Sequence, residues 1–185
     1  MGILKEPVEF VEALKLPKGF SVCELGDQWV TYGTPHVLAS DWYKRIGCGR
    51  YESIDGNDRG TWTHDLNRKL PAAVAPFDLV TDFGTGEHIF DQAQVWRTIH
   101  LLTKPGGYIA FDRPTAGYPG HCFYLINEGL IRDIAAANDY AILRLEPRKT
   151  SRGELIRGVF KKTGTATKFQ VPQQGRYRSI LGAIL

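Results

Sequence analysis

The chain has 185 residues, of which 43% are hydrophobic and 23% charged, values typical of one ordinary globular domain. Its net charge of +3, from 23 basic and 20 acidic residues, argues against a nucleic-acid partner, and no apolar run reaches the ~20 residues of a membrane span. The 3 cysteines follow no metal-ligand spacing and no stretch reads as a signal peptide, so we expect a reduced, cytoplasmic location.

Helix and strand signals alternate along the first half of the chain. The apolar spacing of residues 8–16 predicts a short helix that ends before Pro17, and the apolar run 20–25 predicts a buried strand. The expected elements that follow are a helix over 35–46, a strand over 51–54, a short strand before Asp65 and a strand over 77–81.

The second half continues this alternation and ends in a hairpin. Residues 90–102 are apolar at helical spacing and stop before Pro105-Gly106-Gly107. We then expect a strand over 108–111, a helix over 129–138, and strands over 141–145 and 155–160 with a turn around 150–153. The sequence therefore predicts an α/β fold: a doubly wound, mostly parallel seven-stranded sheet with an antiparallel C-terminal hairpin.

The domain organisation follows from the same pattern. Residues 1–164 are expected to form a single domain, and residues 165–185 a tail that packs on the domain or on a partner. An apolar chain end has to be covered, and this one is apolar at Ile180, Leu181, Ala183, Ile184 and Leu185. A homodimer contact through the tail is one hypothesis.

Two loops of such a sheet carry residues suited to a nucleotide-type ligand, which would bind beyond the carboxyl ends of the strands. Gly26 follows the first strand and lets a ligand approach the backbone, but the loop lacks the G-x-G-x-x-G pattern of dinucleotide sites. Asp55 ends the second strand, where a carboxylate can accept hydrogen bonds from both hydroxyls of a ribose. Asp55-Gly56 is also a common turn pair, and that reading stays open.

Two further loops follow the third and fourth strands. Residues 63–67 offer the Asp65 carboxylate and a backbone N–H to an adenine edge. Residues 82–88 contain two glycines that allow close approach of a ligand, while Glu87 suits the N-terminus of a helix. Asp82, Glu87 and His88 lack a clean metal-ligand spacing, so no metal is expected.

Taken in order, these loops resemble the class I S-adenosylmethionine-dependent methyltransferase family over residues 20–160. The matching segments are Glu24-Leu25-Gly26, Asp55, Asp65-Leu66, residues 77–80 with Glu87-His88, and Leu101-Leu102-Thr103-Lys104-Pro105-Gly106-Gly107, which is similar to the family's turn before strand five. The resemblance implies a Rossmann-like methyltransferase fold and S-adenosyl-L-methionine as the cofactor. The cofactor-binding residues that it implies are Glu24, Gly26, Gln28, Asp55, Gly56, Asp65, Leu66, Asp82 and Phe83.

The sequence departs from the family pattern in its first loop. Gln28 stands where the family has a second glycine, so the cofactor contact there must differ or be lost. The segment from Gly26 to Asp55 is roughly ten residues longer than usual. The extra loop, residues 29–36, is a candidate cover for the cofactor.

Two histidines are candidates for acid–base work on a methyl acceptor. His121 lies in the loop after the fifth strand, beside Tyr118, Phe123 and Tyr124, which can line an acceptor pocket. The alternative is a loop packed by its aromatic residues, with His121 in a structural hydrogen bond. His88 lies next to the cofactor loop, as a structural or substrate contact or as a base.

The resemblance thus implies methyl transfer to a nitrogen or oxygen of a small molecule or glycan. An alternative is a non-catalytic module of the same fold that scaffolds a partner, an interpretation that Gln28 keeps open. A nucleotide-dependent oxidoreductase is disfavoured by the missing glycine pattern.

Overall fold

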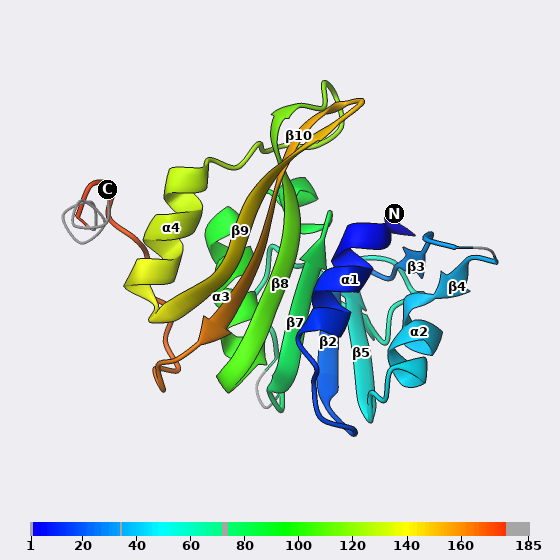
Figure 1. Cartoon of the computed structure of the whole chain (residues 1–185). Helices are drawn as coiled ribbons and strands as arrows, with labels where there is room; N and C mark the ends of the chain where they lie inside the picture. The colour runs from blue at the N-terminus through cyan, green and yellow to red at the C-terminus, as the bar shows by residue number, and fades with distance from the viewer. Residues whose placement is uncertain (1, 34, 72–73, 177–185) are drawn as a thin grey trace.

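The computed structural model describes residues 2–33, 35–71 and 74–176. The main sheet has seven strands (Figure 1). In spatial order they are β6 (Trp62–Thr63), β5 (Arg50–Asp55), β2 (Ser21–Leu25), β7 (Phe77–Phe83), β8 (Thr103–Gly117), β10 (Gly153–Lys162) and β9 (Tyr140–Thr150). The first five are mutually parallel, whereas β10 runs antiparallel to both β8 and β9. The predicted α/β sheet with an antiparallel C-terminal hairpin is confirmed.

Helices cover both faces of this sheet (Figure 1). The period-two alternation of the strands divides the core: Val22 packs in one layer and Cys23 in the other. The first layer receives α1 (Lys5–Ala13) and α2 (Ala39–Arg45), and the second receives α3 (Gln92–Leu102) and α4 (Glu128–Ala137). No helix in the described part of the chain is long and apolar enough to cross a membrane.

A second, small sheet lies at one end of the main sheet and is formed by β1 (Gly2–Ile3), β3 (Trp29–Val30) and β4 (Val37–Leu38). The predicted helix over 35–46 is therefore too long at its start, because residues 37–38 pair with β3 and the helix begins at Ala39. Residues 29–30 of the predicted covering loop are a strand of this sheet. Trp29 lines a surface hollow with Tyr51 of β5 and with residues 59–61 of the loop that follows β5.

The fifth parallel strand is longer than predicted and contains the glycine-rich turn. Phe77 pairs with Thr103 and Leu79 with Tyr108, so the intervening Pro105-Gly106-Gly107 segment forms a bulge within β8. Gly106 has φ +78°, a conformation that glycine adopts without strain. The resemblance placed this segment before the strand; the structure places it inside.

The described part of the C-terminal tail lies against α3 and α4. Phe169 is buried in the α3/α4 layer, and the Asn138 side chain donates a 3.0 Å hydrogen bond to the carbonyl of Gln170. The carbonyl of Ala166 lies 2.8 Å from His100 Nε2. The apolar residues 180–185, on which the dimer hypothesis depends, lie outside the described residues.

Candidate functional site

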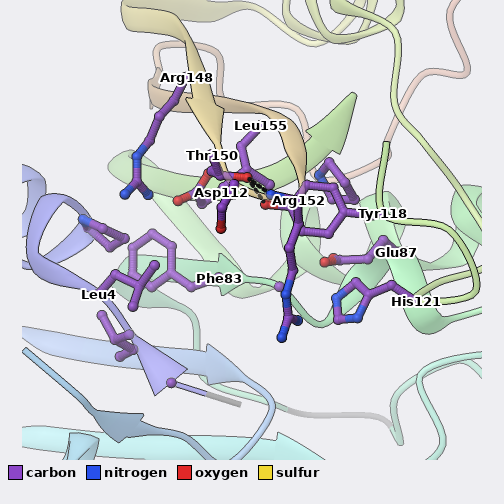
Figure 2. Close-up of a pocket in the computed structure, with 16 residues that line it drawn as sticks. Leu4, Phe83, Glu87, Asp112, Tyr118, His121, Arg148, Thr150, Arg152 and Leu155 are labelled. Atoms are coloured by element: carbon purple, nitrogen blue, oxygen red, sulfur yellow. Dashed lines mark hydrogen bonds between the residues drawn. The ribbon is translucent and has the colours of Figure 1, made fainter. Parts of the chain in front are cut away.

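Two cavities lie side by side at the carboxyl ends of the parallel strands. The first, here called the β2–β5 cavity, has a volume of about 530 Å³ and is lined by the loops after β2, β5, β6 and β7. The second, the β8 cavity, has a volume of about 500 Å³ and lies between β8, the β9–β10 turn and the N-terminal segment (Figure 2). Gly84, just after β7, lines both cavities, so the two spaces meet there.

The loop after β2 is held close to the loop after β7. Gly26 has φ +86°, and a Cβ atom there would lie 2.4 Å from Thr85 Oγ1. Any larger residue would displace the Thr85 side chain and strain the backbone at position 26. Thr85 Oγ1 also donates a 2.8 Å hydrogen bond to the Leu25 carbonyl, which fixes the same contact from the other side.

Gln28, at the place of the family's second glycine, strengthens this contact between loops. Its side chain is only 1% exposed, and Nε2 donates a hydrogen bond of 2.8 Å to the Phe83 carbonyl and a longer one, 3.3 Å, to Thr85 Oγ1. The amide thus joins the loop after β2 to the end of the neighbouring strand β7. Gln28 forms part of the cavity wall, but its amide group is directed into the protein.

Two of the predicted acids, Asp55 and Asp65, line the β2–β5 cavity. Asp55 accepts hydrogen bonds from the N–H groups of Asp27 (2.8 Å) and Asn57 (3.1 Å), one on each carboxylate oxygen. Each oxygen can accept a further bond. Hydrogen bonds from Asn67 lower the pKa of Asp65, which is therefore ionised at neutral pH.

The remaining residues implied by the resemblance divide between the two cavities and the interior. Gly26, Gln28, Gly56 and Leu66 line the β2–β5 cavity with the two acids, whereas Phe83 lines the β8 cavity. Glu24 and Asp82 line neither.

Glu24 is fully buried on the α1/α2 side of β2, because its position alternates with that of Cys23. Its Oε2 accepts a 2.8 Å hydrogen bond from the Tyr51 hydroxyl. Burial raises the pKa of Glu24 to about 8. The acid of the first motif is therefore a core group in this protein and does not line the cavity.

Asp82 is buried in an ion pair with Arg113 of β8, a residue that the sequence did not single out. Arg113 Nε donates to Asp82 Oδ2 at 2.8 Å, and Arg113 Nη1 donates to Gln92 Oε1 at 2.9 Å. Asp82 Oδ1 in turn accepts the Gly86 N–H at 2.8 Å. This network fixes the turn that leads into the short helix η1 (Gly86–His88).

A signal for this pair was present in the sequence. Asp82 and Arg113 each follow the apolar segment of a strand, and the two strands are parallel neighbours. Opposite charges at such positions meet at the same end of the sheet. The register between β7 and β8 then decides the pairing.

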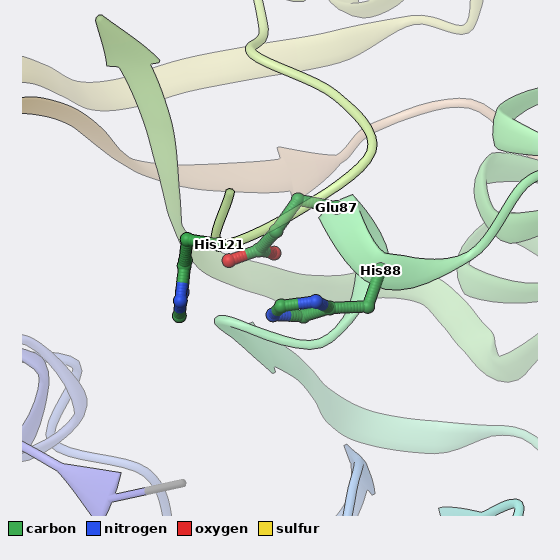
Figure 3. Close-up of side chains that lie close together, drawn as sticks. All are labelled: Glu87, His88 and His121. Atoms are coloured by element: carbon green, nitrogen blue, oxygen red, sulfur yellow. The ribbon is translucent and has the colours of Figure 1, made fainter. Parts of the chain in front are cut away.

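Glu87, His88 and His121 lie together between the two cavities (Figure 3). The N–H groups of Phe123 and Tyr124 donate to the Glu87 carbonyl at 3.1 and 3.3 Å, which brings the loop after β8 onto η1. The rings of His88 and His121 are 4.9 Å apart, centre to centre. His88 lines the β2–β5 cavity, and Glu87 and His121 line the β8 cavity.

The electrostatics of this group follow from its burial. Burial, with the neighbouring Asp82 carboxylate, raises the pKa of Glu87 to about 7. Burial and the nearby His121 lower the pKa of His88, so that its ring is neutral at neutral pH. The candidate bases that the sequence suggested are thus next to each other and next to both cavities.

No protein-family model and no curated protein sequence matches the chain. Solved structures do match it. A Burkholderia thailandensis 1,6-didemethyltoxoflavin-N1-methyltransferase, with S-adenosylhomocysteine bound, has a TM-score of 0.61 and 15% identity over 85% of this chain and 77% of its own. An N-methyltransferase of Bradyrhizobium japonicum has a TM-score of 0.61 and 13% identity, over 86% and 95%. A Synechocystis magnesium protoporphyrin IX methyltransferase, with S-adenosylmethionine bound, has a TM-score of 0.61 and 15% identity, over 85% and 76%. The chain therefore has the fold that these methyltransferases share.

Proposed function

We propose that the protein transfers a methyl group from S-adenosyl-L-methionine to a nitrogen or oxygen atom of a small polar molecule or glycan. The observation that carries this proposal is the pair of adjoining cavities that meet at Gly84, with two histidines between them. A transfer between two molecules requires two sites whose reacting atoms are held in contact.

The β2–β5 cavity suits the cofactor in size and charge. Its volume of about 530 Å³ lies within the usual range for small-molecule sites. Its walls carry the carboxylates of Asp27, Asp55 and Asp65 against one arginine, Arg59. This negative excess favours a cationic ligand. When bound, S-adenosylmethionine supplies a methyl group on a positively charged sulfonium.

Individual residues would hold the parts of the cofactor as follows. Asp55 would accept the ribose hydroxyls with the lone pairs that its two backbone contacts leave free. Asp65 would accept a hydrogen bond from the adenine amino group, and the Leu66 backbone would lie beside it. Gly26 would place the main chain close to the ligand.

The β8 cavity is lined by apolar side chains, among them Leu4, Phe83 and Leu155, and by several polar ones that suit the polar groups of an acceptor. Among the described residues, three buried atoms at its wall have no hydrogen-bond partner: Glu87 Oε2, Asp112 Oδ1 and Arg148 Nη1. Buried polar atoms need partners, and this set offers both acceptors and a donor. Because the three atoms are themselves buried, their side chains would have to turn toward the cavity to pair with the hydroxyl groups of an acceptor such as a sugar.

His121 and His88 are the proposed bases for the acceptor. Both rings lie where the two cavities approach each other, and a neutral imidazole accepts a proton near neutral pH. The non-catalytic alternative depended on Gln28. That side chain points into the protein rather than across the cavity, so it does not oppose cofactor binding.

A methyl-labelling experiment tests the proposal. The full chain is incubated with methyl-labelled S-adenosylmethionine and a fractionated small-molecule extract, with the Asp55→Ala variant in parallel. We expect label in a polar fraction with the wild type and much less with the variant. Cofactor binding without transfer to any fraction, sugar fractions included, would favour the non-catalytic alternative.

A further inference from the structure

We propose that Glu87, His88 and His121 form a binding site for one divalent transition-metal ion. The proposal goes beyond methyl transfer, because the site would bind its ion whether or not the protein transfers methyl groups. Each residue offers one ligand atom, and these atoms all lie within 4.8 Å of one another (Figure 3). In a tetrahedral site with bonds of ~2.1 Å, ligand atoms are ~3.4 Å apart, so side-chain shifts of roughly 1 Å would close the group on an ion.

In this group, two atoms that can bind an ion lack a hydrogen-bond partner within the described part of the chain. Glu87 Oε2 and His88 Nε2 are buried and have no hydrogen-bond partner among the residues that the structure describes. Glu87 is only 3% exposed. Buried polar groups left without partners destabilise the fold, and one ion would satisfy both atoms at once.

The main chain holds the three ligands in place. Glu87 and His88 belong to η1, while His121 comes from the loop after β8. Hydrogen bonds from Phe123 and Tyr124 to the Glu87 carbonyl join the two segments. The His121 N–H donates a 3.1 Å bond to the Tyr118 carbonyl, which fixes the turn that carries the ring. Side chains that are already held in place lose little conformational entropy when they bind an ion.

The local charge also favours a cation. Arg113 Nε lies 4.0 Å from Glu87 Oε2 and would repel an ion if it stood alone. Asp82 pairs with the same guanidinium, so Asp82, Glu87 and Arg113 together carry one net negative charge when ionised.

The ligand set indicates the class of ion. Two imidazoles and one carboxylate are typical of zinc sites that keep an open position and of non-haem iron(II) sites. Magnesium and calcium prefer oxygen ligands throughout. The open position would face the β8 cavity, which Glu87 and His121 line. If the proposed methyl transfer is correct, a hydroxyl acceptor would bind at this open position. The ion would then lower the pKa of the hydroxyl and replace the two histidines in the role of base proposed above.

Cobalt(II) titration of the full chain tests the site. Tag-free protein is stripped with a chelator and titrated with Co²⁺, whose visible absorption reports imidazole ligands, and Zn²⁺ is then added in competition. We expect one Co²⁺ per chain, displaced by Zn²⁺, and binding at least ~10-fold weaker in His88→Ala and in His121→Ala. The matched control is His36→Ala, since His36 is exposed and outside the group; it should bind as the wild type does.

Two outcomes would overturn the site: a folded wild type that binds neither ion, or unchanged binding in His121→Ala. His121 is a half-buried loop residue, so this variant should fold, and far-UV circular dichroism checks that it does. Titration of the same samples with S-adenosylmethionine separates the two proposals. Metal binding without cofactor binding contradicts only the proposed function, and cofactor binding without metal binding contradicts only the metal site.

Discussion

The side-chain amide of Gln28 donates a 2.8 Å hydrogen bond to the carbonyl oxygen of Phe83 and so joins the loop after β2 to the end of β7. In the family that the sequence resembles, a glycine stands at the place of Gln28. Here the longer side chain fixes the relative positions of the two loops that line the β2–β5 cavity. The departure from the motif is thus an additional structural contact.

Replacing Gln28 by alanine should lower the free energy of unfolding by about 1–3 kcal/mol, because the buried Phe83 carbonyl loses its partner. Urea denaturation measures the change. Gln174→Ala, at an exposed position, is the control and should change stability by less than about 0.5 kcal/mol. Equal stability of the two variants would show that the hydrogen bond from Gln28 to Phe83 contributes nothing to the stability of the fold.

Replacing Arg113 by methionine should destabilise the fold by about 3–5 kcal/mol, because Asp82 is left as a buried charge without its partner. Adding Asp82→Asn should restore part of the loss, since the neutral amide needs no counter-charge. Denaturation of the wild type, both single variants and the double variant measures the coupling between the two residues. Strictly additive effects would contradict the ion pair.

Stability should fall as the pH rises from about 5 to about 8, because burial raises the pKa of Glu24 from 4.5 to about 8. In that interval the unfolded chain has released the Glu24 proton while the folded chain retains it, so rising pH favours unfolding. The loss should amount to a few kcal/mol. Glu24→Gln removes the titrating group, and urea denaturation at several pH values should give a flatter profile than the wild type. If stability depended on pH in the same way in both proteins, Glu24 would not be the source of the pH dependence.

Local sequence patterns predicted the order of helices and strands, but long-range contacts set several boundaries. The helix expected over 35–46 begins only at Ala39, since residues 37–38 pair with β3. The helix expected over 90–102 begins at Gln92, because the Asp91 side chain accepts the Gln94 N–H at 2.8 Å and caps the helix. A capping rule applied to Asp91 would have given this start from sequence.

The candidate site was predictable only in part, for a similar reason. The place of Asp55 at the cavity could be predicted because the residue ends a strand, a position that local patterns reveal. Asp82 was expected at the cofactor, but the register of β7 and β8 directs it to Arg113. The approach of His121 to His88 depends on the hydrogen bond between Phe123 and Glu87, which joins distant segments. Spacing along the sequence carries no sign of such a contact.

Calorimetric titration with S-adenosylhomocysteine, the stable product form of the cofactor, tests the central claim most directly. The wild type should bind it, and Asp55→Ala should weaken binding by about 1–3 kcal/mol if the carboxylate accepts the ribose hydroxyls. Asp58→Ala, at an exposed position of the same loop that does not line the β2–β5 cavity, should bind as the wild type does. A folded wild type that binds neither S-adenosylhomocysteine nor S-adenosylmethionine would contradict the account.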